Sequence, residues 1–543
     1  MYITEINIVN FKSFGERFNL KFNKDLNILV GDNEAGKSTI LEAINLVLTG
    51  TIGGKFIKNE LSQYLFNNAV VDRYIAEVNK GEEMPQLPEI YIEVHLSDDN
   101  SKFRGNDNLD GVDSCGLYIR VAFNDDFKGE YEELIKNKEI KTLPIEYYDF
   151  YWSSFARNNA ITTRSIPIKS ALIDTSSSRF QNGSDVYVSR IVRDLLKKED
   201  IVAVSQAYRK MKDDFGNDDS VRLINKKLEK AVDISNKDVA LGVDLSPRNA
   251  WEGNLLTYLD KVPFHHIGKG EQSIVKTKLA LNHKKSQEAN VILLEEPENH
   301  LSHTKLNNLI KDITDHKYDK QIIVSTHNSF VANKLGLDKL VLLNNHQTTT
   351  FNDLTYDTQR FFSKLAGYNT LRLMLCQKAI LVEGDSDELI IQKAYMSQHN
   401  GLLPIEDGID VISVGTSFLR FLEIAEKINK TVAVVTDNDG DVDAVKKKYA
   451  NYIEGNKKNN IDIYFDNIVD QNGALKDFNY NTLEPKMLKA NGRDVLNEIF
   501  GKFYKTDDEL LNYMHKNKTE CALAIFETEE QIKYPQYILD AIT

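Results

Sequence analysis

Hydrophobic and polar residues alternate at the start of the chain, in ITEINIV at residues 3–9, and again in EIYIEVHL at residues 89–96. A period of two is typical of a β-strand that is buried on one face only. The sequence therefore predicts a half-buried strand in each of these two segments.

Short runs that are apolar throughout follow later in the chain. NVILLEE, QIIVST and KLVLLNN lie between residues 258 and 345, and AILVEGD, IDVISVG and TVAVVTDNDG come after them. Parallel strands that are covered on both faces have this continuous apolar character. The last three runs each end in charged or glycine residues, which predicts an α/β fold with a site at the carboxyl ends of its strands.

The middle of the chain has a different character. Residues 190–240 are rich in Lys and Asp and have a helical pattern without catalytic-looking residues. We expect a helical insertion over residues 161–255, used for dimerisation or for bracing the head. The polar stretch NHQTTTFNDLTYDT at residues 344–358 is predicted to be a linker.

The overall composition excludes only a few classes of protein. A chain of 543 residues is too long for one core, and its 41% hydrophobic and 27% charged residues are ordinary for a globular protein. No apolar run approaches the roughly 20 residues that span a bilayer. Three scattered cysteines exclude a disulfide scaffold and suit the cytoplasm. The net charge of -14 neither favours nor excludes a nucleic-acid partner, because a local basic stripe is enough to bind phosphates.

Gly31–Ser38 fits the pattern G-x-x-x-x-G-K-[ST], between a predicted strand, LNILV, and a predicted helix, STILEAINLVL. In this setting backbone N–H groups surround the phosphates of ATP, Lys37 reaches the β and γ oxygens, and the Ser38 hydroxyl ligates Mg²⁺. The nucleotide contacts expected from this loop are Asn33, Gly36, Lys37, Ser38 and Thr39.

Two later strands end in residues that suit ATP hydrolysis. In VILLEEPENHL, Glu295 is expected to bind Mg²⁺ directly or through water, and Glu296 to polarise the attacking water. In QIIVSTHNS, His327 is placed to sense the γ-phosphate. The segment HHIGKGEQS adds three candidates before a helix, Gly268, Gly270 and Gln272.

This set of motifs resembles the ABC ATPases, and among them the SMC/RecF-like branch, of which the opening ITEINIVNFKSF is typical. The resemblance implies an ATPase head built from residues 1–160 and 256–350. It also implies a head-to-head homodimer or higher homo-oligomer, in which the GKGEQ loop of one subunit covers the ATP of the other. Two departures leave the rate of turnover open, because Glu295 replaces the usual Asp and GKGEQ lacks the Ser-Gly-Gly order.

A second cluster of acidic residues follows the later strands. Glu383 ends one strand, Asp387 and Glu388 open the next helix, and TVAVVTDNDGD supplies Asp437, Asp439 and Asp441. Oxygen ligands that converge from two strand ends suit Mg²⁺ or Mn²⁺. Two such ions, roughly 4 Å apart, would activate water and stabilise the leaving oxygen of a phosphodiester. Either acidic cluster alone could instead be a solvated loop.

These motifs resemble a Toprim domain, with Glu383-Gly384 on one strand and Asp437-x-Asp439 on another. A calcium loop is rejected, since the glycine of DNDGD comes early and no Glu stands at the twelfth position. A topoisomerase would need a further tyrosine-bearing domain, and a primase a zinc module that three scattered cysteines cannot form.

An ABC head followed by Toprim resembles the OLD (overcoming lysogenisation defect) family of nucleases, and FFSKLAGYNTLRLMLCQKAILVEGDSDEL at 361–389 carries this resemblance. It implies a Toprim nuclease domain over residues 360–543. The metal ligands that it implies are Glu383, Asp387 or Glu388, Asp437, Asp439 and Glu484. It also implies a basic residue that faces the scissile phosphate, for which Lys518 is the choice and Lys516 the alternative.

The expected function is an ATP-regulated, metal-dependent endonuclease that cuts double-stranded DNA in anti-phage defence. A second protein such as a helicase or a reverse transcriptase is a possible defence partner. Two alternatives stay open, a non-nucleolytic DNA-binding repair or clamp ATPase, and a nuclease that acts on RNA.

Overall fold

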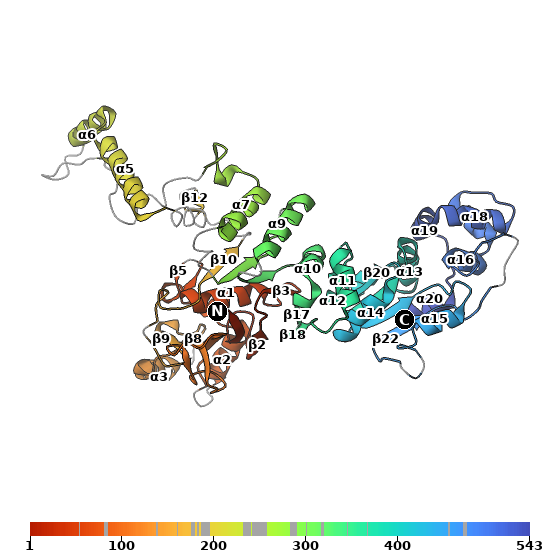
Figure 1. Cartoon of the computed structure of the whole chain (residues 1–543), viewed down its shortest axis with the longest axis horizontal. Helices are drawn as coiled ribbons and strands as arrows, with labels where there is room; N and C mark the ends of the chain where they lie inside the picture. The colour runs from red at the N-terminus through yellow and green to blue at the C-terminus, as the bar shows by residue number, and fades with distance from the viewer. Residues whose placement is uncertain are drawn as a thin grey trace. The chain divides into compact units, whose positions relative to one another are not determined.

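The computed structural model covers the whole chain and divides into two compact units (Figure 1). One unit is Met1–Thr326 with Leu343–Thr348, and the other is His327–Leu342 with Thr349–Thr543. The residues that the structure describes are 1–53, 55–80, 85–136, 140–159, 161–174, 180–181, 184–185, 196–231, 241, 258–282, 290–299, 301–316, 320–344, 346–365, 367–453, 455, 457–470 and 475–543.

The first unit contains an antiparallel sheet near the amino terminus. The two strands predicted from alternation are confirmed as β1 (Ile3–Val9) and β6 (Ile90–Leu96), which pair with each other. The sheet has the order β2-β1-β6-β8-β7, and β9 pairs with β8. The bounds of the other strands are β2 (Phe18–Lys21), β7 (Arg104–Gly105), β8 (Ser114–Phe123) and β9 (Tyr148–Ser154).

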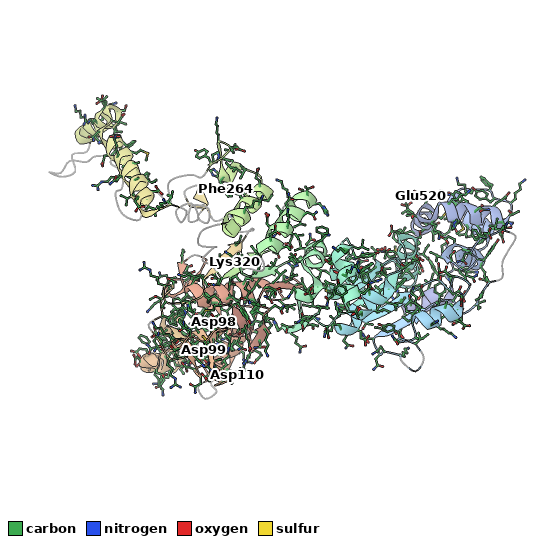
Figure 2. All side chains as sticks on the ribbon, in the orientation of Figure 1. Asp98, Asp99, Asp110, Phe264, Lys320 and Glu520 are labelled. Atoms are coloured by element: carbon green, nitrogen blue, oxygen red, sulfur yellow. The ribbon has the colours of Figure 1, made fainter. Side chains whose placement is uncertain are left out.

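Charged side chains at the surface of this sheet form exposed ion pairs. Arg17 lies 2.6 Å from Asp110 and Arg104 lies 2.9 Å from Asp99, and both aspartates are labelled in Figure 2. Exposed pairs of this kind contribute little to stability. We assign them no functional role.

The second sheet of this unit positions the glycine-rich loop. It has the order β10-β15-β16-β3-β17-β18, and the strands from β10 to β3 pair in parallel. Every residue of β3 and β16 is buried, as expected of strands covered on both faces. The strand bounds are β3 (Leu26–Gly31), β10 (Ser170–Asp174), β15 (Val291–Glu295), β16 (Gln321–Ser325), β17 (Leu340–Asn344) and β18 (Gln347–Thr350).

The segment 161–255 was predicted to be a helical insertion, but one part of it is a β-strand. The first strand in this segment is β10, which pairs with β15 inside the central sheet. Helices do follow in its described part, as α5 (Lys198–Asn217) and α6 (Asp219–Ala231). Residues 175–179, 182–183, 186–195, 232–240 and 242–255 of the predicted insertion lie outside the described residues.

The second unit is built on a parallel sheet with the order β20-β19-β21-β22. The apolar runs predicted as parallel strands are confirmed as β19 (Lys378–Val382), β20 (Ile409–Ser413) and β21 (Thr431–Val435), joined by β22 (Ile461–Tyr464). The predicted linker contains β18 and the start of α11 (Tyr356–Lys364), and the boundary between the units passes through it.

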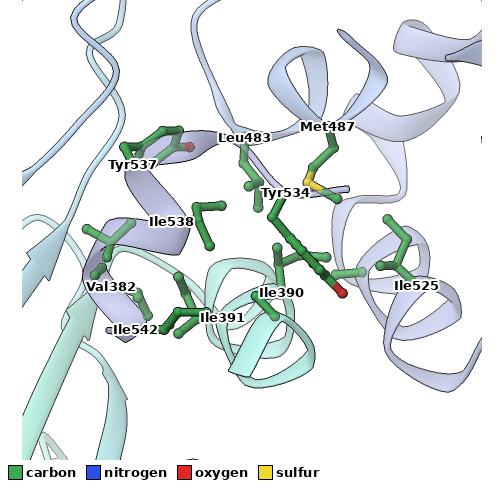
Figure 3. Close-up of a cluster of buried hydrophobic side chains, with 14 of the residues drawn as sticks. Val382, Ile390, Ile391, Leu483, Met487, Ile525, Tyr534, Tyr537, Ile538 and Ile542 are labelled. Carbon is green, nitrogen blue, oxygen red and sulfur yellow. The ribbon is translucent and has the colours of Figure 1, made fainter. Parts of the chain in front are cut away.

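Helices cover this sheet and enclose a core that is shown in Figure 3. Val382 of β19 belongs to the same buried cluster as Ile391 of α13, Met487 of α16 and Ile538 of α20. The helices concerned are α13 (Asp385–Gln398), α16 (Leu483–Asn491), α19 (Lys518–Glu527) and α20 (Gln536–Ile542).

The remaining helices and short hairpins complete the two units. The helices are α1 (Lys37–Thr49), α2 (Asn68–Lys80), α3 (Lys128–Lys136), α7 (Lys269–Asn282), α9 (His303–His316), α10 (Ser329–Leu335), α11 (Tyr356–Lys364), α12 (Thr370–Leu375), α14 (Phe418–Lys427), α15 (Val442–Lys448), α17 (Arg493–Phe500) and α18 (Asp507–Lys516). The short strands are β4 (Thr51–Ile52), β5 (Lys55–Phe56), β11 (Phe180–Gln181), β12 (Ser184–Asp185), β13 (Tyr258–Leu259) and β14 (Val262–Pro263). Within the described residues, no helix is both long enough and apolar enough to cross a membrane.

Candidate nucleotide and carboxylate sites

The glycine-rich loop connects β3 to α1, as its pattern predicts. Gly36 precedes α1 with a φ of 95°, a conformation that side-chain-bearing residues rarely adopt. A Cβ atom at Gly36 would also lie 2.4 Å from the ring of Phe14. Backbone conformation and packing therefore both require glycine at this position.

Lys37, the first residue of α1, is buried, and its ammonium group donates to two backbone carbonyls. Nζ lies 2.8 Å from the carbonyl oxygen of Gly31 and 2.9 Å from that of Asp32. Burial lowers the pKa of Lys37, while the charges of Glu296 and Asp32 act in the opposite direction. Oxygen atoms of a triphosphate could replace these two carbonyls, since both are acceptors of the same donor.

The other loop residues differ in exposure. Asn33 and Ser38 are exposed, as residues that meet a ligand from solvent should be, whereas Thr39 is buried. The Thr39 hydroxyl lies 3.0 Å from the hydroxyl of Ser13. Thr39 is therefore already engaged with the segment between β1 and β2.

Glu295 and Glu296 stand at the carboxyl end of β15. Glu296 has a φ of 40°, which is uncommon for a residue with a side chain and occurs often at functional sites. Its N–H donates to the carbonyl of Ser325 at 3.0 Å, and its Oε2 accepts from Nδ2 of Asn299 at 2.9 Å. The charges of Glu295 and Glu296 both act on Lys37, so the two motifs lie close enough to serve one nucleotide.

Glu298 was not anticipated from the sequence. Its Oε1 accepts a hydrogen bond of 2.5 Å from the hydroxyl of Thr326, which follows β16, and its charge also acts on Lys37. The E-E-P-E run placed a third carboxylate nearby, but only the fold brings it to Thr326.

The remaining predicted nucleotide contacts lie at the start of α7 and just after the end of β16. Gly268 comes directly before α7, and Gly270 and Gln272 are in its first turn. Gln272 is 5% exposed, and its Nε2 donates to the carbonyl of Ile267 at 2.9 Å. His327 follows the end of β16 by two residues.

The carboxylate site begins at two neighbouring parallel strands. Glu383 directly follows β19 and Asp437 follows β21 by two residues, and β19 pairs with β21. The Val414–Gly415 turn fixes the backbone of Glu383, whose carbonyl accepts from the N–H of Gly415 at 3.0 Å. The Asp387 carboxylate accepts from the N–H of Gly384 at 3.0 Å and so caps α13.

Electrostatics show that these carboxylates form one cluster. Burial, aided by the charges of Glu383 and Glu484, raises the pKa of Asp387 to about 6. Burial also raises the pKa of Asp437 well above its ordinary value, with contributions from the charges of Asp387 and Glu484. Neighbouring carboxylates thus raise the pKa values of Asp387 and Asp437, and a cation bound between them would stabilise their charged forms.

Glu484 brings Lys518 to the cluster. The Glu484 side chain is 7% exposed, and its Oε1 lies 3.0 Å from Nζ of Lys518 at the start of α19. Burial acts to lower the pKa of Lys518, but the hydrogen bond and charge of Glu484 outweigh burial and raise it. The charges of Asp437 and Asp387 act on Lys518 as well, whereas Lys516 is an exposed residue at the end of α18.

Three other predicted ligands have partners of their own. Glu388 lies 3.6 Å from the guanidinium of Arg372, and Asp441 caps α15 by accepting from the N–H of Ala444 at 2.9 Å. The structure does not bring these two into the cluster. Asp439 is exposed with a φ of 49°, and its Oδ1 accepts from Nδ2 of Asn479 at 2.8 Å.

The oxygen ligands of the cluster suit a hard divalent cation, although in this structure they are not arranged in a complete coordination shell. Among the residues that the structure describes, no group of three or more His, Cys, Asp and Glu is arranged to hold a metal ion as it stands. The chemistry nevertheless fits Mg²⁺ or Mn²⁺, because oxygen ligands predominate and Asp387 and Asp437 have raised pKa values.

Sequence reasoning missed several residues beside this cluster. Tyr537 of α20 is buried, and burial and the charge of Asp437 raise its pKa well above the ordinary value. Asn438 and Lys486 are buried polar residues that contact the segment after β22. Tyr537 and Lys486 belong to no motif, and Asn438 is the unspecified position of Asp437-x-Asp439, so only the fold could reveal their contacts.

Two family models match successive parts of the chain. The family model described as "RecF/RecN/SMC N terminal domain" matches residues 2–351, which is more than half of the chain. The family model described as "Overcoming lysogenization defect protein-like, TOPRIM domain" matches residues 374–439, a span that contains Glu383, Asp387 and Asp437.

Curated relatives match over parts of the chain. The chain is 26% identical over 155 residues to "Structural maintenance of chromosomes protein 3 homolog" of Plasmodium falciparum (isolate 3D7), covering 26% of this chain and 13% of that protein. It is 31% identical over 103 residues to "DNA replication and repair protein RecF" of Alkaliphilus oremlandii (strain OhILAs), covering 19% and 26%. It is 44% identical over 162 residues to "Chromosome partition protein Smc" of Fusobacterium nucleatum, covering 26% and 14%. The chain thus spans about a quarter or less of each of these relatives.

Similar solved structures include "Crystal structure of the SmcHead bound to the C-winged helix domain of ScpA", at 15% identity and a TM-score of 0.34, covering 64% of this chain and 96% of that one. "SMC head domain from Thermotoga maritima" matches at 16% identity and a TM-score of 0.28, covering 64% and 97%. The family assignment rests on the two family models and not on these structures. The chain belongs to the RecF/RecN/SMC N-terminal domain family and, with a TOPRIM domain after its ATPase head, has the architecture of an OLD family nuclease.

Proposed function

We propose that this protein is an ATP-regulated, divalent-metal-dependent endonuclease that hydrolyses phosphodiester bonds of double-stranded DNA. The observation that carries the proposal is the cluster of Glu383, Asp387, Asp437 and Glu484 beside Lys518, in which Glu484 is buried, Asp387 and Asp437 are half-buried and Glu383 is exposed. A set of mutually repelling carboxylates with one lysine is costly unless cations and an anionic substrate complete it.

Each residue has a distinct role in the proposed reaction. Glu383, Asp387 and Asp437 would hold Mg²⁺ or Mn²⁺, with Asp439 and Glu484 at the edge of the set. The bound metal would supply an activated water and stabilise charge on the leaving oxygen. Lys518 pairs with Glu484 and, from the first turn of α19, would bind a phosphate oxygen of the substrate.

The ATPase head would regulate this reaction rather than perform it. ATP would bind through Lys37, Ser38 and Thr39, with Mg²⁺ held by Ser38 and Glu295 and water polarised by Glu296. Gly268, Gly270 and Gln272 of one subunit would approach the ATP of the other, while His327 senses the γ-phosphate. Closure of the homodimer would then control access of DNA to the carboxylates.

The biological setting is part of the proposal. The protein would act as an effector of anti-phage defence in the cytoplasm, in agreement with its three cysteines, which are all free thiols. A helicase or a reverse transcriptase is the kind of partner that we expect.

Cleavage of supercoiled plasmid tests the proposal and sets the sign of the nucleotide effect. The full chain is incubated with plasmid and Mn²⁺ or Mg²⁺, with and without ATP, beside Lys37→Ala. We expect metal-dependent cutting, and a response to ATP that Lys37→Ala abolishes. ATP turnover without cleavage of DNA or RNA under either metal would instead support a non-nucleolytic repair or clamp ATPase. Cleavage of RNA alone would change the substrate but keep the chemistry.

A further inference from the structure

Lys486 is a buried lysine beside the carboxylate cluster that the proposed reaction does not use. Its side chain is 4% exposed and lies on α16, two residues after Glu484. Nζ lies 2.6 Å from Oδ2 of Asp466 and 2.7 Å from Oδ2 of Asp470, and donates to the carbonyl of Ile468 at 3.0 Å. The three protons of the ammonium group thus have three acceptors, all in the segment that follows β22.

The same segment also binds Asn438, the residue between Asp437 and Asp439. Asn438, which is 1% exposed, donates through Nδ2 to the carbonyls of Ile468 at 3.0 Å and Asp466 at 2.6 Å. Its Oδ1 accepts from the N–H of Gly440 at 3.0 Å. The carbonyl of Ile468 is therefore shared by Lys486 and Asn438, and it links the buried lysine to the residue that separates the two aspartates.

Burial makes this link rigid. A buried ammonium group is stable only while paired and hydrogen-bonded, so Lys486 fixes the conformation of residues 466–470. Fully satisfied buried polar networks of this kind specify a single arrangement. A second lysine, Lys489, also contacts Asp470, but its side chain is 58% exposed, and within the described residues its only hydrogen bond is to Asp470 and not to Ile468.

We propose that Lys486 is a positioning residue, which holds the Asp437–Asp439 loop in the geometry that binds the divalent metal, through Ile468 and Asn438. The inference rests on the proposed function, because it assumes that these carboxylates bind metal. Lys486 also pairs with Asp466, whose charge reaches Tyr537 together with that of Asp437, and so keeps this further carboxylate out of the ligand set.

The test measures Mn²⁺ binding to the full chain by isothermal titration calorimetry, without nucleotide or DNA. The heat that Asp437→Asn removes defines binding at the carboxylate site. We expect Lys486→Met to raise the dissociation constant at this site by about tenfold or more, as loss of a partner that orients a ligand typically does. Lys489→Met is the matched control and should bind Mn²⁺ like the wild type.

Asn438→Ala provides a second variant, because it breaks the same link without removing the lysine that pairs with Asp466 and Asp470. It should weaken Mn²⁺ binding as Lys486→Met does, and it decides the question if circular dichroism shows that Lys486→Met is unfolded. Wild-type affinity in the folded Lys486→Met and Asn438→Ala variants would overturn the inference and leave the proposed function standing, as would equal losses in Lys486→Met and Lys489→Met. Absence of any heat that depends on Asp437 would overturn both.

Discussion

Nζ of Lys518 lies 3.0 Å from Oε1 of Glu484, and these two residues come from different helices, α19 and α16. The carboxylate is nearly inaccessible to solvent, whereas the lysine side chain is 44% exposed. The lysine can therefore neutralise the cluster on one side and meet a substrate phosphate on the other.

Replacing Lys518 with methionine should slow DNA cleavage by about a hundredfold, the usual effect of removing one charged or hydrogen-bonding group from a reacting centre. The physical reason is twofold, since the phosphate loses a cation and Glu484 loses its neutralising partner. Initial rates of plasmid nicking at saturating Mn²⁺ measure the effect. Lys516→Met, on the exposed end of α18, is the control, and an equal loss in both variants would show that Lys518 has no specific role.

Asp387 should make the metal-free protein less stable as pH rises. Its pKa in the folded state, about 6, lies above that of an unfolded aspartate, about 3.9, so the folded state binds more protons between these values. Stability from this group is present below the lower pKa and is lost as pH rises through about 6. The difference of about two pH units corresponds to about 3 kcal/mol.

Urea unfolding in EDTA at pH 5 and pH 7.5 checks this expectation. Asp387→Asn removes the titrating group, so the free energy of unfolding of the variant should improve relative to wild type at the higher pH. A difference between the two proteins that does not change with pH would contradict the assignment.

Replacing Lys37 with alanine should abolish ATP binding, because this buried ammonium is the cation that the loop offers to the phosphates. We expect affinity for a fluorescent ATP analogue to fall by at least about a hundredfold, as for other charged groups bound in a fully desolvated site. Lys24→Ala changes an exposed lysine before β3 and should leave the affinity unaltered. ATP binding by Lys37→Ala at wild-type strength would contradict the nucleotide site.

Glu296 should matter for hydrolysis but not for binding of ATP. Loss of a residue that polarises water typically slows a reaction by about 10²–10⁴-fold, and Glu296→Gln keeps the size of the side chain. Phosphate release and analogue binding, measured side by side, separate the two steps. Asn299→Ala removes only the hydrogen bond to Oε2 of Glu296 and should cause a smaller loss of rate. Unchanged turnover in Glu296→Gln would assign the role of base to another residue.

Sequence patterns anticipated the strands and the residues at their ends. Glu383 and Asp437 follow buried apolar runs, and because β19 and β21 are parallel neighbours, those runs necessarily bring their carboxyl ends together. The glycine-rich loop could also be predicted from the sequence. Gly36 and Lys37 belong to a motif in which binding of phosphates requires these residue types at these positions.

Other features depend on packing that no local pattern encodes. Asp387 and Glu388 are neighbours in the sequence, but successive helical residues point about 100° apart, and Glu388 turns to Arg372. Lys486 was missed because its acceptors, Asp466 to Asp470, approach it only when α16 packs beside the segment after β22. β10 was assigned to a helical insertion because five residues are too few for a periodic signal to stand out.

The central claim is that the carboxylate cluster cuts DNA, and conversion of supercoiled plasmid by Asp437→Asn is its most direct test. This variant keeps the size of the side chain, and Lys489→Met serves as a matched control outside the cluster. With Mn²⁺ present, wild type and Lys489→Met should convert supercoiled plasmid to nicked or linear products, while Asp437→Asn leaves it supercoiled. Cutting by Asp437→Asn at the wild-type rate would contradict the account.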